Sequence, residues 1–363
     1  MTVLLSSEVA EEIEELLYLI RSTSPEEQIV IHAPDSVLRC VDLGDRTMLR
    51  TISVRHHAHR ARVIPKLVGF GEFALLAIRS RPRLIVSGFS MLKHRAMSRV
   101  LGVPHVSYIR GLMFNPETHL GISDKIRFGL ARGKNVRLLN AFEADAVLTV
   151  ARINEDFMVT RGIDRDRIVQ VGPVWLRDVP PAPSGFVDGR IFFVTKAFEA
   201  HGADDAHERQ VSVVHRLVAS LPGRVAIRAH PRDYYDYEAD PLLRDVFIDR
   251  SSPRAFLHSL IREDLLISPL STLAFEALHV GVPVLFFTAD GVTDDLLDAY
   301  SRLNIDAVDL ASVVERVEEG TSAASHGVAP VFSVLDVASA TRVLRERVIW
   351  VGSERKKVGG PVD

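Results

Sequence analysis

Two short stretches in the second half of the chain combine residue types that bind phosphate and ribose. The first, Arg228-Ala-His-Pro-Arg232, closes an apolar run typical of a strand. Pro231 has no N–H for a sheet ladder, so the strand should stop there and leave His230 at its carboxyl end. At that place the imidazole can donate to a phosphate oxygen, and Arg228 or Arg232 can pair with the same charge. The alternative is that His-Pro-Arg only begins a loop.

The second stretch is Ser268-Pro-Leu-Ser-Thr-Leu-Ala-Phe-Glu276. The hydroxyls of Ser268, Ser271 and Thr272 would stand at the start of a helix, where unsatisfied N–H groups and the helix dipole attract anions. Glu276 lies four residues beyond Thr272, on nearly the same helix face, and can accept from the hydroxyls of a ribose. Ordinary N-capping is the alternative explanation for Ser271 and Thr272.

The elements that must position these residues alternate between strands and helices. In the first half we predict strands at 28–32, 48–54, 83–89, 105–109, 146–150 and 167–171, and helices at 8–20, 64–78, 91–101, within 122–142 and at 154–160. In the second half we predict strands at 190–195, 225–229, 246–249, 265–267 and 283–287, and helices at 207–220, 253–260, 270–279, 294–303, 310–319 and 337–348. This alternation predicts parallel sheets covered by helices on both faces.

A Pro-rich segment divides the alternating pattern. Residues 174–189 show no sustained period and contain three prolines within four positions, Pro180, Pro181 and Pro183, which is typical of a linker. We therefore predict an N-terminal acceptor domain at 1–175, a linker at 176–189, a C-terminal donor domain at 190–350 and a tail at 351–363. The expected fold class is α/β, with two Rossmann-like doubly wound parallel-sheet domains facing a cleft where ligands bind outside the carboxyl ends of the strands.

Charge is distributed unevenly along the chain. The formal net charge is -3, yet residues 46–140 carry 18 Lys or Arg and only three Asp or Glu. Such a field attracts an anionic partner, although a solvated basic face without a ligand remains an alternative. We do not expect nucleic acid, because no recognisable binding module is present and few aromatic residues lie among the charges.

The remaining composition excludes several other classes. A single cysteine, Cys40, excludes an internal disulfide and a cysteine-based metal cluster. No apolar run approaches the roughly 20 residues of a membrane span, and the start of the chain lacks the basic and long apolar regions of a signal peptide. We therefore expect a cytoplasmic protein, with the inner face of the membrane as a second option.

Part of the chain resembles a known family. The pattern Ser268-x-x-Ser-Thr-x3-Glu-Ala-Leu-x2-Gly-Val-Pro-Val-Leu285 is similar to the donor-nucleotide segment of GT-B glycosyltransferases, and 144–173 resembles the end of their acceptor domain. Many retaining members have a second glutamate eight residues before the first, but Ser268 stands at that position. The His230-Pro231 and Ser271-Thr272 pairs resemble motifs of an inverting branch, the bacterial sialyl- and polysialyltransferases and related capsule or teichoic-acid transferases.

The resemblance implies a metal-independent, inverting glycosyltransferase without a cofactor. It would move a sugar from a nucleotide, with a CMP sugar favoured, to an acidic or phosphate-bearing glycan or lipid-linked acceptor in surface polysaccharide synthesis. His230, Arg228 or Lys196 would neutralise the leaving phosphate. The implied donor-binding residues are Thr195, Lys196, Arg228, Pro231, Arg232, Ser268, Ser271, Thr272 and Glu276.

The catalytic base should come from the basic domain. His119, Glu117 and Asp124 are the candidates beside His230 for the catalytic set. Two dipeptides that each follow a predicted strand should border the acceptor site, and they are Ser87-Gly88 and Arg110-Gly111.

Three other functions remain open at this stage. They are a CDP-glycerol-type glycerophosphotransferase, a UDP-sugar 2-epimerase and an inactive nucleotide-sugar-binding protein. The expected partners are a nucleotide sugar and an anionic glycan or lipid-linked acceptor, with peripheral contact to an anionic membrane as an option.

Overall fold

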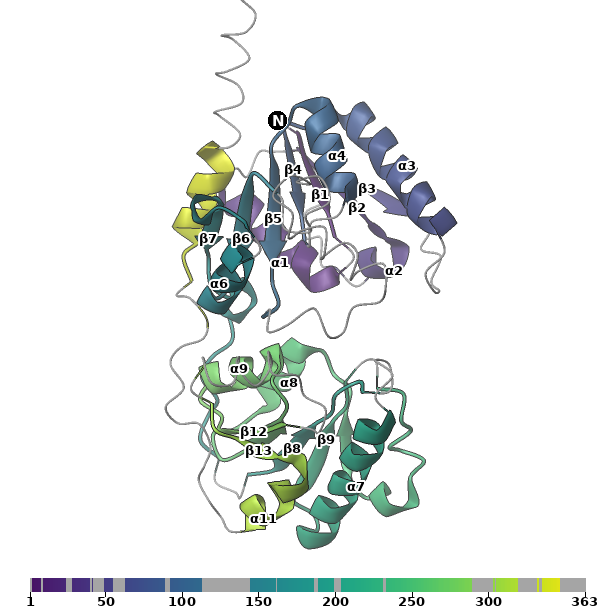
Figure 1. The fold of residues 1–363 in the computed structure, drawn as a ribbon, viewed down its shortest axis with the longest axis vertical. Helices are drawn as coiled ribbons and strands as arrows, with labels where there is room; N and C mark the ends of the chain where they lie inside the picture. The colour runs from purple at the N-terminus through teal and green to yellow at the C-terminus, as the bar shows by residue number, and fades with distance from the viewer. Residues whose placement is uncertain are drawn as a thin grey trace, which may run out of the picture. The chain divides into compact units, whose positions relative to one another are not determined.

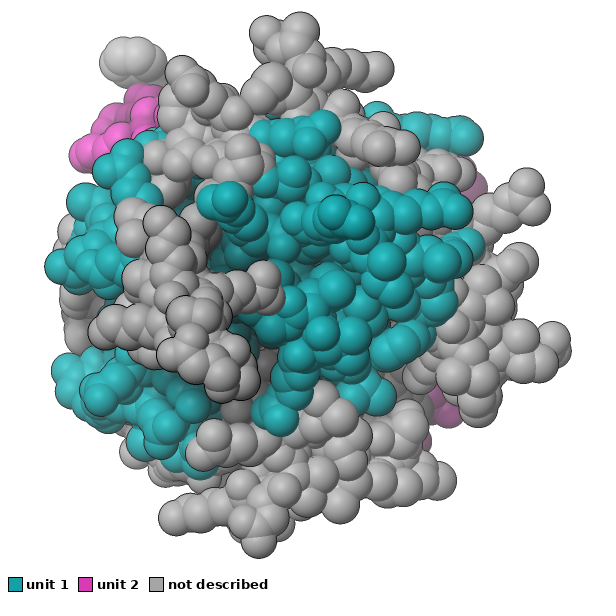
Figure 2. All heavy atoms as spheres, turned by 90° about the horizontal axis from the view of Figure 1, so that it is seen from above, with its two compact units in different colours: residues 1–113, 120–175, 332–363 teal, residues 114–119, 176–331 magenta. Residues whose placement is uncertain are grey.

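A computed structural model gives the structure of this protein. It describes residues 2–7, 9–23, 28–39, 41, 49–54, 63–88, 92–112, 144–160, 162–185, 189–198, 204–230, 233–288, 303, 305–318, 332 and 335–346. The chain divides into two compact units, which are taken one at a time below. Unit 1 comprises 1–113, 120–175 and 332–363, and unit 2 comprises 114–119 and 176–331; Figure 2 colours them separately.

Unit 1 is built on a seven-stranded parallel sheet with the order β3-β2-β1-β4-β5-β6-β7 (Figure 1). Its strands are β1 (Thr2–Ser6), β2 (Gln28–Pro34), β3 (Leu49–Val54), β4 (Leu84–Ser87), β5 (His105–Ile109), β6 (Ala146–Thr149) and β7 (Ile168–Gln170). Its helices are α1 (Ala10–Thr23), α2 (Asp35–Leu38), α3 (Val63–Ser80), α4 (Leu92–Leu101) and α6 (Arg152–Thr160). Strands β4 and β5 are buried along their whole length and β1 at all but its first residue, as expected for a sheet covered on both faces.

Helices α3 and α4 pack together on one face of this sheet (Figure 1). Phe73 and Leu76 of α3 and Met97 of α4 join Leu4 of β1 and Ile85 of β4 in one buried cluster. The apolar stripe of each helix, spaced by three or four residues, is what fixes it on the strands.

Unit 2 repeats the same plan with a six-stranded parallel sheet, in the order β10-β9-β8-β11-β12-β13. Its strands are β8 (Ile191–Val194), β9 (Val225–Arg228), β10 (Phe247–Asp249), β11 (Leu265–Ser268), β12 (Val284–Thr288) and β13 (Ala307–Asp309). Its helices are α7 (Asp204–Ser220), α8 (Pro253–Ser259), α9 (Thr272–His279) and α11 (Val313–Glu318), with short 3-10 helices at Pro241–Leu243 and Leu310–Ser312. Both sheets thus have the doubly wound arrangement expected from the sequence.

The end of the described chain returns to unit 1. Phe332 forms an antiparallel bridge with Ala151 and packs edge-on against Trp175, and the N–H of Asp336 donates to the carbonyl of Val171 at 3.0 Å. A helix over 337–346 follows. The predicted donor domain extended over 190–350, but residues 332–346 belong to unit 1, where the apolar side chain of Phe332 is buried.

The Pro-rich segment also differs from the predicted free linker. Val179 and Ala182 are buried, and the Ala182 N–H donates to the carbonyl of Val280 at 2.7 Å. Residues 176–185 therefore pack on unit 2.

The predicted elements within the described residues are confirmed in type, with ends that shift by a few residues. Strand β1 was not predicted, although it lies at the centre of the sheet of unit 1. The predictions for 122–142 and for most of 294–303 lie outside the described residues.

Candidate functional site

The carboxyl edge of the unit 2 sheet gathers most of the predicted donor-binding residues. Strand β8 pairs with β9 on one side and with β11 on the other, so the chain winds in opposite directions from this point. A crevice outside such a switch point is where ligands of doubly wound sheets bind. The segments that leave these three strands begin at Thr195, Ala229 and Pro269.

Thr195 and His230 are held together at this edge. The Thr195 N–H donates to the carbonyl of Arg228 at 3.0 Å, and the Thr195 hydroxyl oxygen accepts from the His230 N–H at 2.9 Å. Thr195 is buried and His230 is half-buried. The Thr195 hydroxyl therefore fixes the backbone of His230 at this edge. Pro231 and Arg232 themselves lie outside the described residues.

Lys196 brings a positive charge to the same edge. Its ammonium lies 5.4 Å from the centroid of the Phe198 ring, and among the described residues no carboxylate pairs with it. Burial lowers the pKa of Lys196 below the ordinary value. A desolvated cation of this kind is stabilised by an incoming anion.

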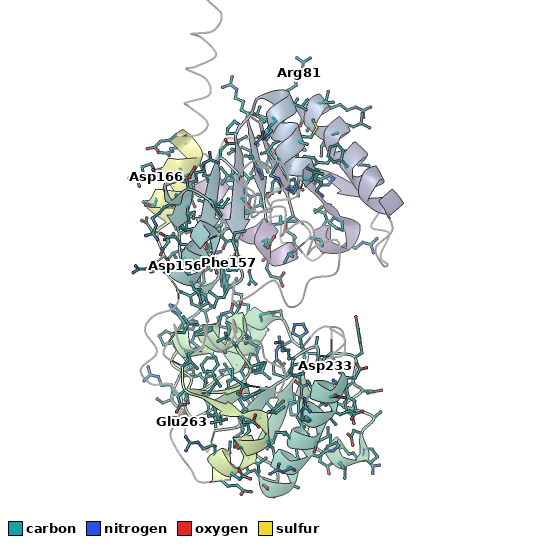
Figure 3. All side chains as sticks on the ribbon, viewed as in Figure 1. Arg81, Asp156, Phe157, Asp166, Asp233 and Glu263 are labelled. Atoms are coloured by element: carbon teal, nitrogen blue, oxygen red, sulfur yellow. The ribbon has the colours of Figure 1, made fainter. Side chains whose placement is uncertain are left out.

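Two residues that the sequence analysis missed anchor the segments after β8 and β9. Gln210, fully buried on α7, accepts from the Lys196 N–H at 2.8 Å and donates to its carbonyl at 3.2 Å. Asp233 accepts from the Tyr237 hydroxyl at 2.9 Å, and its own N–H donates to the carbonyl of His230 at 2.9 Å (Figure 3). A glutamine on the apolar face of a predicted helix was the available signal for Gln210.

Ser268 and Ser271 form the turn that opens α9. Their hydroxyl oxygens are 3.1 Å apart, and Ser271 caps the helix by accepting from the Ala274 N–H at 3.2 Å. Thr272 is the first helical residue and is half-buried. The N-cap that was the alternative explanation for Ser271 is therefore present. Because a cap satisfies only one of the free N–H groups of the first turn, the anion site stays a prediction.

Glu276 lies one turn further along α9 and is only 2% exposed. Its neighbours Phe275 and Ala277 are buried as well. The role of Glu276 as an acceptor for ribose hydroxyls stays a prediction.

Arg228 was predicted to bind phosphate, but its guanidinium is already paired within unit 2. Its guanidinium forms an ion pair with Asp249 of β10, directly opposite in the strand register, and lies 4.9 Å from the centroid of the Phe256 ring. Both members of the pair are buried. The ion pair therefore satisfies the charge of Arg228 without a phosphate.

The switch point of unit 1 lies between β1 and β4, where Ser87 and Gly88 were predicted to border an acceptor. The Gly88 N–H donates to the carbonyl of Ser6 at 3.1 Å, and the Ser87 hydroxyl bonds to Nε2 of His105 at 2.8 Å. The two residues therefore sit at the expected edge, with Ser87 turned into the interior.

The second predicted acceptor pair, Arg110-Gly111, follows β5. The guanidinium of Arg110 bonds to Glu15 at 2.7 Å and lies 4.4 Å from the Trp175 ring centroid. The carbonyl of Gly111 accepts from the Asn154 amide at 2.9 Å. His119, Glu117 and Asp124, the candidate bases, lie outside the described residues.

Unit 1 also contains a buried polar cluster that was not predicted. The Ser6 hydroxyl lies 3.2 Å from Nδ1 of His32 and 3.0 Å from Nε2 of His94, and the ring of Phe73 packs edge-on against both imidazoles. Burial lowers the pKa of His32 and of His105 to about 3, and that of His94 well below its ordinary value. These imidazoles are neutral at physiological pH.

The described residues contain neither a metal-binding cluster nor a membrane-spanning helix. No group of three or more His, Cys, Asp or Glu is arranged to hold a metal ion. No helix in that part of the chain is long and apolar enough to cross a membrane.

Several proteins of known structure have a similar fold. No protein-family model and no curated protein matches the chain. Among solved structures, the Methanocaldococcus jannaschii UDP-GlcNAc 2-epimerase in complex with UDP-GlcNAc and UDP has a TM-score of 0.65 at 13% identity, covering 95% of this chain and 99% of that one. The Neisseria meningitidis UDP-GlcNAc 2-epimerase bound to UDP-GlcNAc gives 0.64 at 12%, covering 96% and 100%. A glycotransferase of kitacinnamycin gives 0.58 at 15%, covering 97% and 95%.

These similarities confirm the predicted architecture of two doubly wound α/β domains, the GT-B fold. At such low identity they establish the fold and leave the reaction to be argued from the residues. They do not favour the sialyltransferase-like branch over other users of this fold.

Proposed function

We propose that this protein is an enzyme that binds a nucleotide sugar on unit 2 and acts on its sugar. The observation that carries the proposal is the carboxyl edge of β8, β9 and β11. This edge combines the cation of Lys196, which has no carboxylate partner in the part of the chain that the structure describes, with the fixed backbone of His230 and the Ser268–Ser271 turn at the start of α9.

Each group has a distinct role in the proposal. The Lys196 ammonium and the first N–H groups of α9 bind the phosphates, because both present positive charge at one edge of the sheet. Glu276 accepts the ribose hydroxyls one turn below. His230 donates to the phosphate as the bond to the sugar breaks, which stabilises the leaving group.

Epimerisation at C2 of a UDP sugar is the first candidate reaction. Several UDP-GlcNAc 2-epimerases of known structure match this chain over nearly their whole length. We therefore propose a uridine diphosphate sugar as the substrate in place of the CMP sugar that the motifs favoured. A CMP sugar and CDP-glycerol are the alternative substrates that a binding experiment must compare with it.

Transfer of the sugar to an acceptor is the second candidate. The 18 basic residues of 46–140 favour it, because an epimerase has no anionic acceptor to bind. The acceptor in this reading is an acidic or phosphate-bearing glycan or lipid. A peripheral position at an anionic membrane follows from the same charge and stays a prediction.

A nucleotide screen tests the common core of both reactions. Ligand binding raises the midpoint of thermal unfolding by mass action, so UDP should raise it more than CMP, CDP or GDP at equal concentration. Absence of a shift with every nucleotide would refute the proposal. A larger shift with CMP or with CDP-glycerol would instead support the sialyl or the glycerophosphotransferase function.

Turnover then separates the reactions. Product from UDP-GlcNAc alone identifies an epimerase, and product only with an acidic acceptor identifies a transferase. Binding without turnover in either assay identifies an inactive nucleotide-sugar-binding protein.

A further inference from the structure

Both backbone polar groups of His230 are held by residues of its own unit. The N–H of His230 donates to the Thr195 hydroxyl oxygen at 2.9 Å, and its carbonyl accepts from the Asp233 N–H at 2.9 Å. Each peptide group is planar, so fixing the nitrogen and the carbonyl of a residue also fixes the direction of its Cα–Cβ bond. These two contacts therefore set the direction in which the His230 side chain leaves the backbone.

The side chain of Tyr237 links the two contacts. Its hydroxyl donates to Oδ2 of Asp233 at 2.9 Å, and the hydroxyl of Thr195 forms a hydrogen bond with the same tyrosine oxygen. A threonine hydroxyl can accept from one group and donate to another, so Thr195 can serve His230 and Tyr237 together. The bonds run from the His230 N–H through these three side chains and return to the His230 carbonyl from the Asp233 N–H. We call these four residues the closed network.

The closed network is shielded from water. Tyr237 is 0% exposed, Thr195 2% and Asp233 4%. A buried polar network whose members are all satisfied holds one arrangement, because each bond is stronger there than in water. Apolar side chains could fill the same space without the cost of burying a carboxylate. The polar residues are therefore better explained by the position that they impose on His230 than by packing.

The carboxylate of Asp233 also joins the closed network to the phosphate-binding cation. The Gln210 amide nitrogen lies 3.5 Å from Oδ2 of Asp233, and the same amide bonds to both backbone groups of Lys196. The Tyr235 N–H supplies a further donor, 3.4 Å from Oδ1. The segments after β8 and β9 are thus tied to each other through buried side chains.

We propose that Tyr237 and Asp233 are positioning residues that hold His230 in the orientation in which it donates to the departing phosphate. This inference rests on the proposed function, and every member of the closed network belongs to unit 2. Neither positioning residue contacts the phosphate in this proposal, so both affect the reaction only through His230. Both lie within seven residues of His230 in the sequence, yet neither was among the predicted site residues.

The first test is Tyr237→Phe, which removes one hydroxyl and keeps the aromatic group in the core. The kcat should fall by about 10-fold or more, because a small displacement of a catalytic group is sufficient for such a loss. The Kd for UDP should stay within about twofold, since no group that binds the ground state is removed. Tyr235→Phe is the matched control: it removes a hydroxyl that donates to Asp240 at 2.6 Å, outside the closed network, and should keep the rate.

A double-mutant cycle separates positioning of His230 from a general loss of structure. If Tyr237 acts through His230, Tyr237→Phe should lower the kcat of a His230→Ala protein by less than about twofold. Equal losses in the wild-type and His230→Ala backgrounds would overturn the positioning role. An unchanged kcat in Tyr237→Phe itself would overturn it as well.

A second site in the closed network keeps the inference testable if Tyr237→Phe folds poorly. Thr195→Val removes the acceptor of the His230 N–H with little change of shape, so kcat should fall as in Tyr237→Phe. Thr195→Ser keeps the hydroxyl and should stay within about threefold of the wild-type kcat. Equal rates in the valine and serine variants would overturn the positioning role while nucleotide binding stands. Failure of the wild-type protein to bind any nucleotide, or to turn over any nucleotide sugar, overturns the proposed function and this inference with it.

Discussion

The side-chain amide of Gln210 bonds to both backbone polar groups of Lys196, accepting from its N–H at 2.8 Å and donating to its carbonyl at 3.2 Å. A single buried residue of α7 therefore sets the path of the chain at the end of β8. The cation that we assign to phosphate binding depends on this path.

Gln210→Ala should lower the free energy of unfolding of unit 2 by about 1–3 kcal/mol, because it leaves two buried backbone groups without partners. It should also weaken UDP binding, since Lys196 loses its support. Urea denaturation and isothermal titration with UDP measure the two effects. Unchanged affinity in a destabilised variant would mean that the loop keeps its shape without Gln210.

Lys196→Met should weaken UDP binding by about 10- to 100-fold, the range for a lost hydrogen bond to a charged group. Because burial lowers the pKa of Lys196, the wild-type affinity should also fall on the alkaline side earlier than for an exposed lysine, and the variant should not show this fall. Titration calorimetry across pH measures both. Arg244→Met, an exposed change of the same charge on unit 2, is the matched control.

His230→Ala should lower kcat by about 100-fold or more and change the affinity for UDP much less, because the imidazole is assigned to the departing phosphate in the transition state. Steady-state kinetics and nucleotide titration separate the two quantities. Parallel losses of rate and affinity would assign His230 to binding, and no loss of either would remove it from the site.

Unit 1 should lose stability as the pH falls below about 6.5. The folded-state pKa of His32 and of His105 is lowered to about 3, so between these values the unfolded chain binds protons that the folded unit excludes. Each histidine should contribute a slope of about 1.4 kcal/mol per pH unit. The stabilisation is complete above pH 6.5 and is lost on acidification.

Urea unfolding followed by tryptophan fluorescence measures this slope, since Trp175 belongs to unit 1. His105→Gln can keep a hydrogen bond to Ser87 without binding a proton, and it should flatten the slope by the share of one histidine. His258→Gln, an exposed change on α8, should leave the slope as it is.

Local signals were sufficient to predict that these polar residues lie at one edge of the unit 2 sheet. Ser268 ends a strand, and Thr195, His230 and Ser271 each follow a strand within three residues. The carboxyl ends of parallel strands meet at one edge whatever their order. Their chemistry could therefore be predicted from short segments.

Contacts between distant segments could not be predicted in this way. Arg228 has the composition of a phosphate ligand, but its direction is set by Asp249 in the next strand. Glu12 is one of several acidic residues on an amphipathic helix, and its close contact with Gly88 comes from a strand end that is distant in the sequence. Strand β1 was missed because five residues at the start of a chain carry no period, and its central place depends on pairing with β2 and β4.

The return of the chain at Phe332 has a consequence for the order of events during synthesis. Most of unit 2 is inserted in the sequence of unit 1, whose bridge from Ala151 to Phe332 and helix at 337–346 are synthesised after unit 2. Unit 2 can therefore complete its core while unit 1 still lacks these residues. A nascent chain released before Phe332 would expose the Trp175 surface that Phe332 covers, so quality control of this protein should depend on residues 332–346.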